Sequence, residues 1–462
     1  MITMQSLKEK RKLIAAIFTL AGPTMLEEFL HTAVQYIDTA MVGSLGTVAT
    51  AAVGATSTVN WLVSSTVSAL GIGFLAVIAQ ALGAGDRKKA ADAASQAVTV
   101  AFAAGAVLTA ITLSLSKAVP VIMNTDPEIR DIASKYFFII YTPMVFRAAE
   151  IIFSTVFRAS GDSKTPMYVS ITVNVINIVL NFLLIYPTRE ASLLSHTFKI
   201  YGAGFGVLGA AAATAISYAA GGILMTVKLY KHPTLSPRGR SLKPNREYLA
   251  PVFKIALPNM CQRFCTSFGY VAFAGIINSL GKISTAAHTV ANTVESAFYI
   301  PGYGMQSAAA TLAGNALGAR DKNRMREQMR VNLALEVALM TVSGTLLFIF
   351  APTLAGIFSK DAAVIALSSK VLRMVAVSEP VYGVSIIIEG VLLGVGNTKT
   401  PFKFNVICMW GVRILGTFAF VNIMNGTLVS AWGCMIGNNV MLFVLYITYY
   451  LRGKWNPFKN EV

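Results

Sequence analysis

The sequences Gly161–Pro166 (GDSKTP) and Gly396–Pro401 (GNTKTP) are nearly identical and lie 235 residues apart. Other short matches keep this spacing without a gap. They are Pro23 with Pro258, Ser44–Gly46 with Ser279–Gly281, Thr50–Ala52 with Thr285–Ala287, and Ala81–Ala84 plus Asp86 with Ala316–Ala319 plus Asp321. Chance matches would not share one spacing, so the chain contains an internal duplication.

Apolar runs recur along the whole chain. Of its 462 residues 55% are hydrophobic and 13% are charged, and the mean hydropathy of +0.62 is too high for a water-soluble domain. A run of about 20 apolar residues spans a hydrocarbon core of roughly 30 Å as a helix. We predict about twelve such helices, at 14–42, 48–82, 92–115, 132–157, 166–187, 203–229, 251–279, 285–317, 331–351, 364–393, 401–421 and 428–451. The runs lack the short alternating pattern of a membrane β-barrel, so the predicted class is an all-α polytopic membrane protein.

The duplication and the spans together predict two lobes. The repeat spacing covers six helices, an even number, so both copies have the same orientation in the membrane and are parallel repeats. We predict a first six-helix lobe at 1–230, a second at 251–462, and a cytoplasmic linker at 231–250 that is rich in basic residues and proline. Such an architecture places a cavity between the lobes, which suits a transporter that alternates between two conformations.

The positive charge of the chain is unevenly distributed. There are 38 Lys and Arg residues against 21 Asp and Glu, a net charge of +17. Most of the basic residues fall in loops on one side of the predicted spans, which by the positive-inside rule is the cytoplasm. We therefore predict a multi-pass protein of the inner (plasma) membrane with both termini cytoplasmic. The basic loops are expected to fix the topology and to bind no nucleic acid.

The sequence contains no recognisable catalytic or metal-binding motif. Patterns typical of zinc proteases, serine hydrolases and nucleotide-binding loops are missing. The four cysteines, Cys261, Cys265, Cys408 and Cys434, lie inside apolar spans and suggest neither disulfides nor a metal site. We expect no enzymatic activity, no cofactor and no ATP-driven pumping.

The first span carries a stripe of polar residues. Glu27, Glu28, His31, Gln35 and Asp38 are spaced so that they lie near one face of a helix. Glu27 and Glu28 could instead be shallow and interfacial, or the stripe could bond to a neighbouring helix. Asp38 differs because it lies in the outer half of the span, before a short uncharged loop. A buried carboxylate at this depth can exchange a proton, or hold a cation if other oxygens assist.

The fifth span supplies such oxygens at spacings of three and four residues. Asn174, Asn177 and Asn181 lie on one face, although Asn174 could simply bond to a neighbouring helix. The polar cluster belongs to one copy of the repeat only. The second-copy counterparts of Asp38, Asn177 and Asn181 are Phe273, Val412 and Gly416. We therefore expect ion coupling in the first lobe, with the second lobe contributing mainly cavity wall.

The second lobe carries its own intramembrane charges. Glu295, Glu389 and Arg413 lie within spans, and His288 shares a helix face with Glu295. Tyr299 and the neighbouring Tyr303 and Met305 either line an apolar cavity or merely pack. Arg147 and Glu150, three residues apart, are expected to pair with each other. The substrate-cavity candidates are Gln35, His31, Glu295, Tyr299, Glu389 and Arg413.

Several of these motifs resemble those of the multidrug and toxic compound extrusion (MATE) family. They are Asp38–Gly43 (DTAMVG), Leu82–Asp86 (LGAGD), the repeated Gly161–Pro166 and Gly396–Pro401, and Gly209–Ala211 opening the sixth helix. The resemblance covers essentially the whole chain, including the duplication. It implies twelve helices in two six-helix lobes arranged as a V, and export of drugs coupled to entry of protons or sodium ions.

The resemblance also implies roles for individual residues. Asp38 matches the carboxylate of the first helix, Asn177 and Asn181 match the polar pair of the fifth, and Thr214 resembles a hydroxyl ligand of the sixth. A sodium ion would then lie at Asp38, Asn177 and Asn181. Some members have a second carboxylate where this chain has Asn181, so fewer fixed negative charges are present here.

The expected substrates are amphipathic, often cationic, drugs or metabolites, moved by a monomer in the lipid bilayer. One alternative within the same superfamily is a flippase of lipid-linked precursors, which would need a cationic central cavity. The three arginines within spans, Arg147, Arg263 and Arg413, keep that alternative open.

Overall fold

The computed structural model describes residues 4–123, 125–193 and 196–460, and in these the chain is almost entirely helical. The first half contains α1 (Met4–Gly43), α2 (Thr47–Gly83), α3 (Arg87–Ser114), α4 (Ala118–Ile122), α5 (Pro127–Tyr141), α6 (Met144–Ala159), α7 (Lys164–Leu184) and α8 (Gly206–Tyr230). The second half contains α9 (Arg246–Asn278), α10 (Lys282–Gly318), α11 (Lys322–Phe358), α12 (Ala362–Ala376), α13 (Glu379–Gly394), α14 (Lys399–Val406), α15 (Leu415–Phe418) and α16 (Leu428–Leu451). Residues 1–3 and 461–462, and with them the ends of the predicted lobes, lie outside the described part.

The predicted number of spans is confirmed. Among the described residues, eight helices are long and apolar enough to cross a membrane, and two bent pairs bring the number to ten. The bends are 51° between α5 and α6 and 55° between α12 and α13. The remaining two spans are α9 and α10, of 33 and 37 residues, which carry more polar side chains because they line the centre of the molecule. The ten spans identified by length and apolar composition, together with α9 and α10, which are long enough to cross a membrane, give twelve spans.

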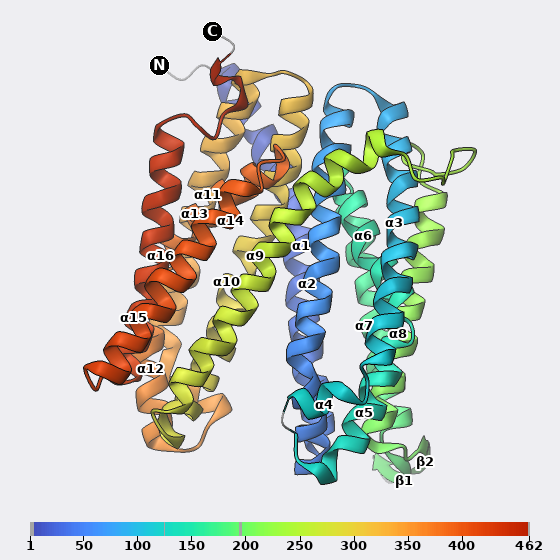
Figure 1. Ribbon diagram of the computed structural model, residues 1–462, viewed down its shortest axis with the longest axis vertical. Helices are drawn as coiled ribbons and strands as arrows, with labels where there is room; N and C mark the ends of the chain where they lie inside the picture. Colours follow the sequence, from blue (N-terminus) through green and yellow to red (C-terminus); the bar gives the residue numbers. More distant parts are fainter. Residues whose placement is uncertain (1–3, 124, 194–195, 461–462) are drawn as a thin grey trace.

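The helices form two lobes. Figure 1 shows α2–α8 on one side and α10–α16 on the other, spreading apart towards the end that carries the strands and α15, while α9 runs diagonally from the first group to the second. The first residues of α1 and the end of α16 lie at the opposite end, together with the turn between α2 and α3. The division at 1–230 and 251–462 stays a prediction, and α9 begins at Arg246, inside the expected linker.

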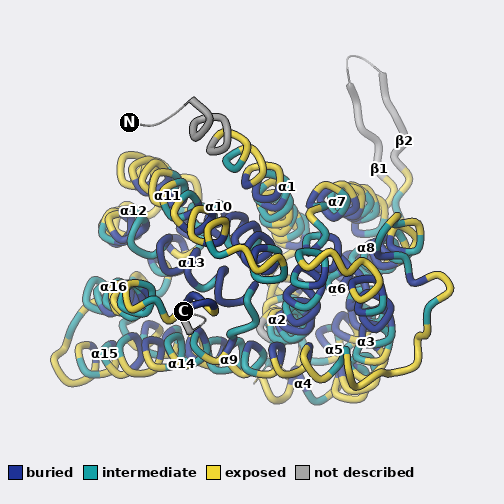
Figure 2. The backbone as a smooth tube through the Cα atoms, turned by 90° about the horizontal axis from the view of Figure 1, so that it is seen from above, coloured by how far each residue is buried: buried dark blue, intermediate teal, exposed yellow. Residues whose placement is uncertain are grey.

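The lobes meet through equivalent helices of the two repeats. The first half of α1 packs on α10, and its repeat counterpart α9 packs on α2. Ile17, Leu20 and Ala21 of α1 are therefore buried in the hydrophobic core of the second lobe. Figure 2 shows α1 and α2 lying near the middle of the molecule, next to the second lobe.

Small residues allow the closest contact, at the end of α2 and α10 that is predicted to be cytoplasmic. A Cβ atom at Gly83 would overlap the carbonyl oxygen of Asn315, and one at Gly318 would overlap that of Gln80. Gln80 also donates a hydrogen bond across the interface to the carbonyl of Gly394 at 3.1 Å. Glycine at these positions lets the two backbones touch, as at other membrane helix interfaces.

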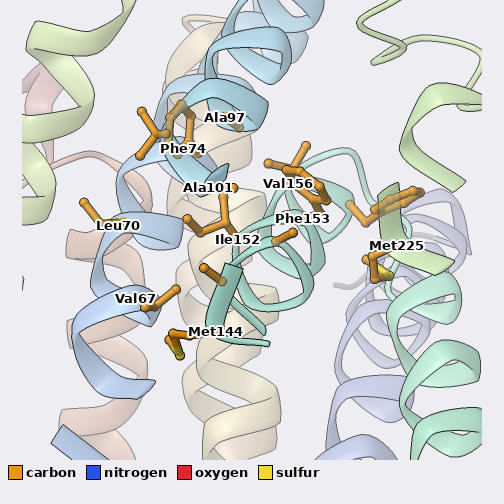
Figure 3. Packing of buried hydrophobic residues seen from close by; sticks show 14 of the residues in the cluster. Val67, Leu70, Phe74, Ala97, Ala101, Met144, Ile152, Phe153, Val156 and Met225 are labelled. Atoms are coloured by element: carbon orange, nitrogen blue, oxygen red, sulfur yellow. The ribbon is translucent and has the colours of Figure 1, made fainter. Parts of the chain in front are cut away.

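Each lobe has its own apolar core. Figure 3 shows part of the core of the first lobe, to which Val67, Leu70 and Phe74 of α2 and Ile152 and Phe153 of α6 belong. Close packing of this kind holds the helices of a lobe at fixed positions, so that the polar side chains between them keep a defined geometry.

Two features outside the spans were not predicted. The loop after α7 forms an antiparallel hairpin of β1 (Pro187–Leu193) and β2 (His196–Ala203). The linker after α8 is held against α3: Ser95 donates to the carbonyl of Ser241 at 3.0 Å, Thr99 donates to that of Leu242 at 2.6 Å, and Arg240 pairs with Asp92. The linker is therefore anchored to the first lobe.

Candidate functional site

A polar cavity lies inside the first lobe. It has a volume of about 370 Å³ and is lined by residues of α1, α2, α5, α6, α7 and α8. All four residues expected to couple ions, Asp38, Asn177, Asn181 and Thr214, line it. Gln35 and His31, about one and two turns before Asp38, line it as well.

Asp38 is held by neutral donors. Asn181 donates from Nδ2 to Asp38 Oδ1 at 2.5 Å. The amide of Asn177 meets more partners with its nitrogen towards Asp38, where it donates to Oδ1 at 2.9 Å while Thr214 donates to its oxygen at 3.3 Å. Asn177 and Asn181 are buried, with 5% and 1% exposure. Among the described residues no basic side chain forms an ion pair with Asp38, so a negative charge there is balanced by amides alone.

The backbone explains why these side chains converge. The spacing of four residues puts Asn177 and Asn181 on adjacent turns of α7. A Cβ atom at Gly209 would overlap the backbone carbonyl of Leu184, so glycine is what lets α8 approach α7 this closely. Thr214, five residues further along α8, is thereby brought to Asn177.

An ion pair between Arg147 and Glu150 lies in the same cavity. Arg147 Nη1 lies 3.0 Å from Glu150 Oε2, which is the predicted pairing. The Arg147 guanidinium also lies over the ring of Tyr218, 4.1 Å from its centroid. Together, the carboxylate and the ring offset the positive charge that the cavity would otherwise have.

The glutamates of the first span have separate places. Glu27 pairs with Arg158 at 2.7 Å, and both side chains are 14% exposed. Arg158 lies one residue beyond the expected end of its span, which is why the sequence did not single it out. Glu28 instead lines the space between the lobes. The polar stripe therefore serves two different cavities.

A larger cavity of about 860 Å³ lies between the lobes. The first lobe contributes Glu28, Gln35 and Trp61, and the second contributes residues of α9, α10, α13, α16 and the π-helical segment Ile407–Ile414. Its charged and aromatic lining from the second lobe includes Arg263, Tyr270, Glu295, Tyr299, Tyr303 and Arg413. Aromatic rings next to both acidic and basic groups suit an amphipathic molecule.

Arg413 and Glu295 form the polar centre of the second-lobe wall. The Arg413 guanidinium lies over Phe273 and Tyr270, 4.2 and 4.8 Å from the ring centroids. Glu295 is 7% exposed and lies within electrostatic reach of Arg413. The counterpart of Asp38 in the second repeat, Phe273, thus faces a cation where Asp38 faces amides.

The structure separates the six substrate-cavity candidates. Gln35, Glu295, Tyr299 and Arg413 line the central cavity. Gln35 also lines the first-lobe cavity, and His31 lines that cavity only. Glu389 lines neither: it accepts hydrogen bonds from Gln262 at 2.9 Å, Tyr446 at 3.2 Å and Asn405 at 3.3 Å. Its place is a hydrogen-bond network within the second lobe, and Met305 is likewise buried in the second-lobe core.

Two buried carboxylates were missed. Glu336 of α11 and Glu379 of α13 are 0% and 2% exposed. Both fall inside predicted spans, at 331–351 and 364–393, and a list of every acid in the spans would have included them. Their surroundings depend on how three helices pack, which the sequence pattern does not give.

Comparison with known proteins agrees with the duplication. The sequence profile of the MatE family matches residues 23–183 and again 258–419. The two matches begin at Pro23 and Pro258, the first pair of the internal repeat. The chain is 28% identical to "Probable multidrug resistance protein NorM" of Thermotoga maritima, over 95% of this chain and 92% of that protein. It is 26% identical to "Multidrug resistance protein MdtK" of Proteus mirabilis, over 88% and 87%.

Solved structures share the fold. One, described as the outward-facing conformation of a multidrug resistance MATE family transporter of the MOP superfamily, superposes with a TM-score of 0.85 at 22% identity, over 95% of this chain and 94% of that one. Another, of a MOP superfamily transporter from Pyrococcus furiosus, has a TM-score of 0.87 at 20% identity, over 96% of both chains. With a family profile matched in both repeats, a duplicated twelve-helix fold and a cavity between two lobes, the chain belongs to the MatE family of membrane transporters.

Proposed function

We propose that the protein is a secondary active exporter of amphipathic, often cationic, drugs or metabolites, driven by protons or sodium ions that enter in exchange. One observation carries the proposal: Asp38 lies in a polar cavity of the first lobe, held by two buried amides and, within the described part of the chain, paired with no basic side chain. In an apolar surrounding such a carboxylate is stable when it is protonated or bound to a cation, and unfavourable when it is bare.

The central cavity is the proposed substrate site. Its aromatic side chains offer apolar area and rings for an organic cation, and Glu28 and Glu295 offer negative charge. Gln35 lines both cavities and so lies between the substrate and Asp38. Loading Asp38 with a proton or cation removes its negative charge next to the central cavity, which weakens the binding of a cationic substrate.

The geometry around Asp38 favours a proton as the coupling ion. A sodium ion needs several oxygen ligands turned towards it, whereas the amides of Asn177 and Asn181 present their nitrogens to the carboxylate. Sodium would require both amides to rotate, with the Thr214 hydroxyl completing the ligand set. The chemistry needs no cofactor, and we propose a monomer in the inner (plasma) membrane with both termini in the cytoplasm.

The flippase alternative is less well supported. Its cationic cavity would rest on the intramembrane arginines, but Arg147 is paired with Glu150 inside the first lobe, and Arg413 is stacked on two rings beside Glu295. Arg263 does line the central cavity. The central cavity contains acids as well as bases. The relatives named above are multidrug resistance proteins, which favours drug export.

Transport in liposomes tests the proposal. Purified protein would be reconstituted, and uptake of ethidium, an aromatic organic cation, would be followed after imposing a pH gradient, a sodium gradient, or neither. We expect a pH gradient to drive accumulation and a sodium gradient alone to drive little. Accumulation of ethidium driven only by a sodium gradient would show that the coupling ion is sodium and not the proton. Transport of a fluorescent lipid without transport of ethidium would favour the flippase.

A further inference from the structure

A second group of buried acids lies in the other lobe, far along the chain from Asp38. Glu336 is 14 residues from the start of α11, so it lies about 21 Å along a membrane-spanning helix. Neither of its carboxylate oxygens has a hydrogen-bond partner among the described residues. Glu379, at the start of α13, also has one carboxylate oxygen without a partner.

The carboxylate of Glu336 lies between three closely packed helices. A Cβ atom at Gly302 of α10 would be 2.8 Å from Glu336 Oε1, and one at Gly383 of α13 would be 3.1 Å from the same oxygen. The glycines therefore leave the space that the carboxylate occupies. The other neighbours of Gly302 and Gly383 are Ile386 and Met340, which are apolar.

These surroundings do not tolerate a bare negative charge. Within the described part of the chain, no ion pair joins Glu336 or Glu379 to a basic side chain. An unpaired ionised carboxylate in a dry apolar site costs many kcal/mol, and the group instead takes up a proton. A hard metal cation would need further oxygen ligands around Glu336, but no described donor or acceptor bonds to its oxygens, and the side chains that share the space beside Gly302 and Gly383 are Ile386 and Met340. The ligand that fits is a proton.

Two other buried acids of the second lobe, Glu379 and Glu295, lie between α11 and the substrate cavity in the order of their electrostatic interactions. Glu379 lies within electrostatic reach of both Glu336 and Glu295, and Glu295 lines the central cavity. Glu379 is in the first turn of α13, where the helix dipole favours a negative charge. From α10 and α13 the other titratable groups near this line are Tyr299, Tyr303 and Tyr382, and Arg413 faces Glu295.

We propose that Glu336 is a second proton-binding site, in the second lobe, which exchanges its proton with the central cavity through Glu379 and Glu295. The site is distinct from Asp38, and it departs from the expectation that the second lobe contributes mainly cavity wall. Its repeat counterpart is Ala101, and that of Glu379 is Met144, so the first lobe has no equivalent at these positions.

Infrared spectroscopy of the purified full-length protein at neutral pH tests the site without a substrate. A protonated carboxyl group gives a C=O stretching band that a carboxylate lacks and that shifts in heavy water. We expect Glu336→Gln to remove a component of this band. The control Glu327→Gln, at an exposed position of the same helix, should leave the band unchanged. Asp38→Asn should retain the Glu336 component, so the result does not depend on the role proposed for Asp38.

The exchange route gives a second readout. After transfer to heavy water, the Glu336 component should shift more slowly in Glu379→Gln protein than in wild type, because the relay is interrupted. If Glu336→Gln does not accumulate, Glu336→Asp retains a carboxyl group and should move the component instead of removing it. An unchanged band in these Glu336 variants would overturn the proton site, and a wild-type shift rate in Glu379→Gln would overturn the route.

Discussion

Asp38 shows how far the sequence alone leads at the scale of a residue. A carboxylate in the first span, and asparagines spaced by four in the fifth, predicted a shared polar cluster, and Asn181 does donate to Asp38 at 2.5 Å. Helical periodicity sufficed because each of these residues lies on one face of its own helix. The surroundings of Glu336 could not be predicted in this way, because the space for its carboxylate is left by glycines on two other helices.

The charge of Glu295 should matter for cationic substrates. Glu295→Gln keeps the shape of the side chain and removes its negative charge from the central cavity wall. A charged contact contributes about 1.5–3 kcal/mol, so affinity for ethidium should fall by roughly tenfold or more. Binding measured by fluorescence in detergent, with a neutral aromatic ligand for comparison, checks this. Equal effects on both ligands would show that Glu295 shapes the cavity and does not attract charge.

At the scale of elements, the spans were predictable and the structure between them was not. Apolar length alone indicated the helices, including α9 and α10. The β1–β2 hairpin lacks an apolar alternation, since it lies outside the helical bundle and is stabilised by its own ladder of hydrogen bonds. The contacts of the linker were not predicted, because the backbone carbonyls of 241–243 that tie it to α3 carry no sequence signal.

Gly209 connects helix packing to the proposed ion site. In Gly209→Ala the new methyl group would overlap the backbone of Leu184, which cannot rotate away, so α8 must shift from α7. We expect a loss of about 1–3 kcal/mol in stability and a weaker contact of Thr214 with Asn177. Thermal unfolding in detergent measures the first effect. The control is Gly433→Ala on α16, where a Cβ meets nothing within 4 Å; equal stability of the two variants would contradict the packing argument.

At the scale of the molecule, the predicted orientation in the membrane can be tested by labelling. In a variant without the four natural cysteines, single cysteines replacing Leu45 or Met424 should react with an impermeant reagent added outside intact cells, because both residues are exposed and lie in loops that are predicted to be extracellular, between α1 and α2 and before α16. A cysteine replacing Arg238, in the linker, should react only after the cells are opened. The reverse pattern would invert the topology.

The contact between α2 and α10 should hold the predicted cytoplasmic end closed. A leucine at Gly318 would collide with the backbone of Gln80 and force the lobes apart there. A cysteine replacing Ser307, which lines the central cavity, should then react faster from the cytoplasmic side of inverted vesicles. Gly356→Leu, at a position with no atom within 4 Å of a Cβ, is the control. Unchanged labelling in Gly318→Leu would show that this contact does not close the cavity.

The central claim is that binding of a proton or cation at Asp38 drives export, and Asp38→Asn tests it most directly. Asparagine resembles the neutral, protonated side chain, so the variant should fold, and ethidium should still equilibrate across the membrane in exchange for ethidium on the other side. Accumulation against a gradient should be lost at every imposed pH or sodium gradient, because the site can no longer change its charge. Wild-type accumulation by well-folded Asp38→Asn protein in liposomes would contradict the account.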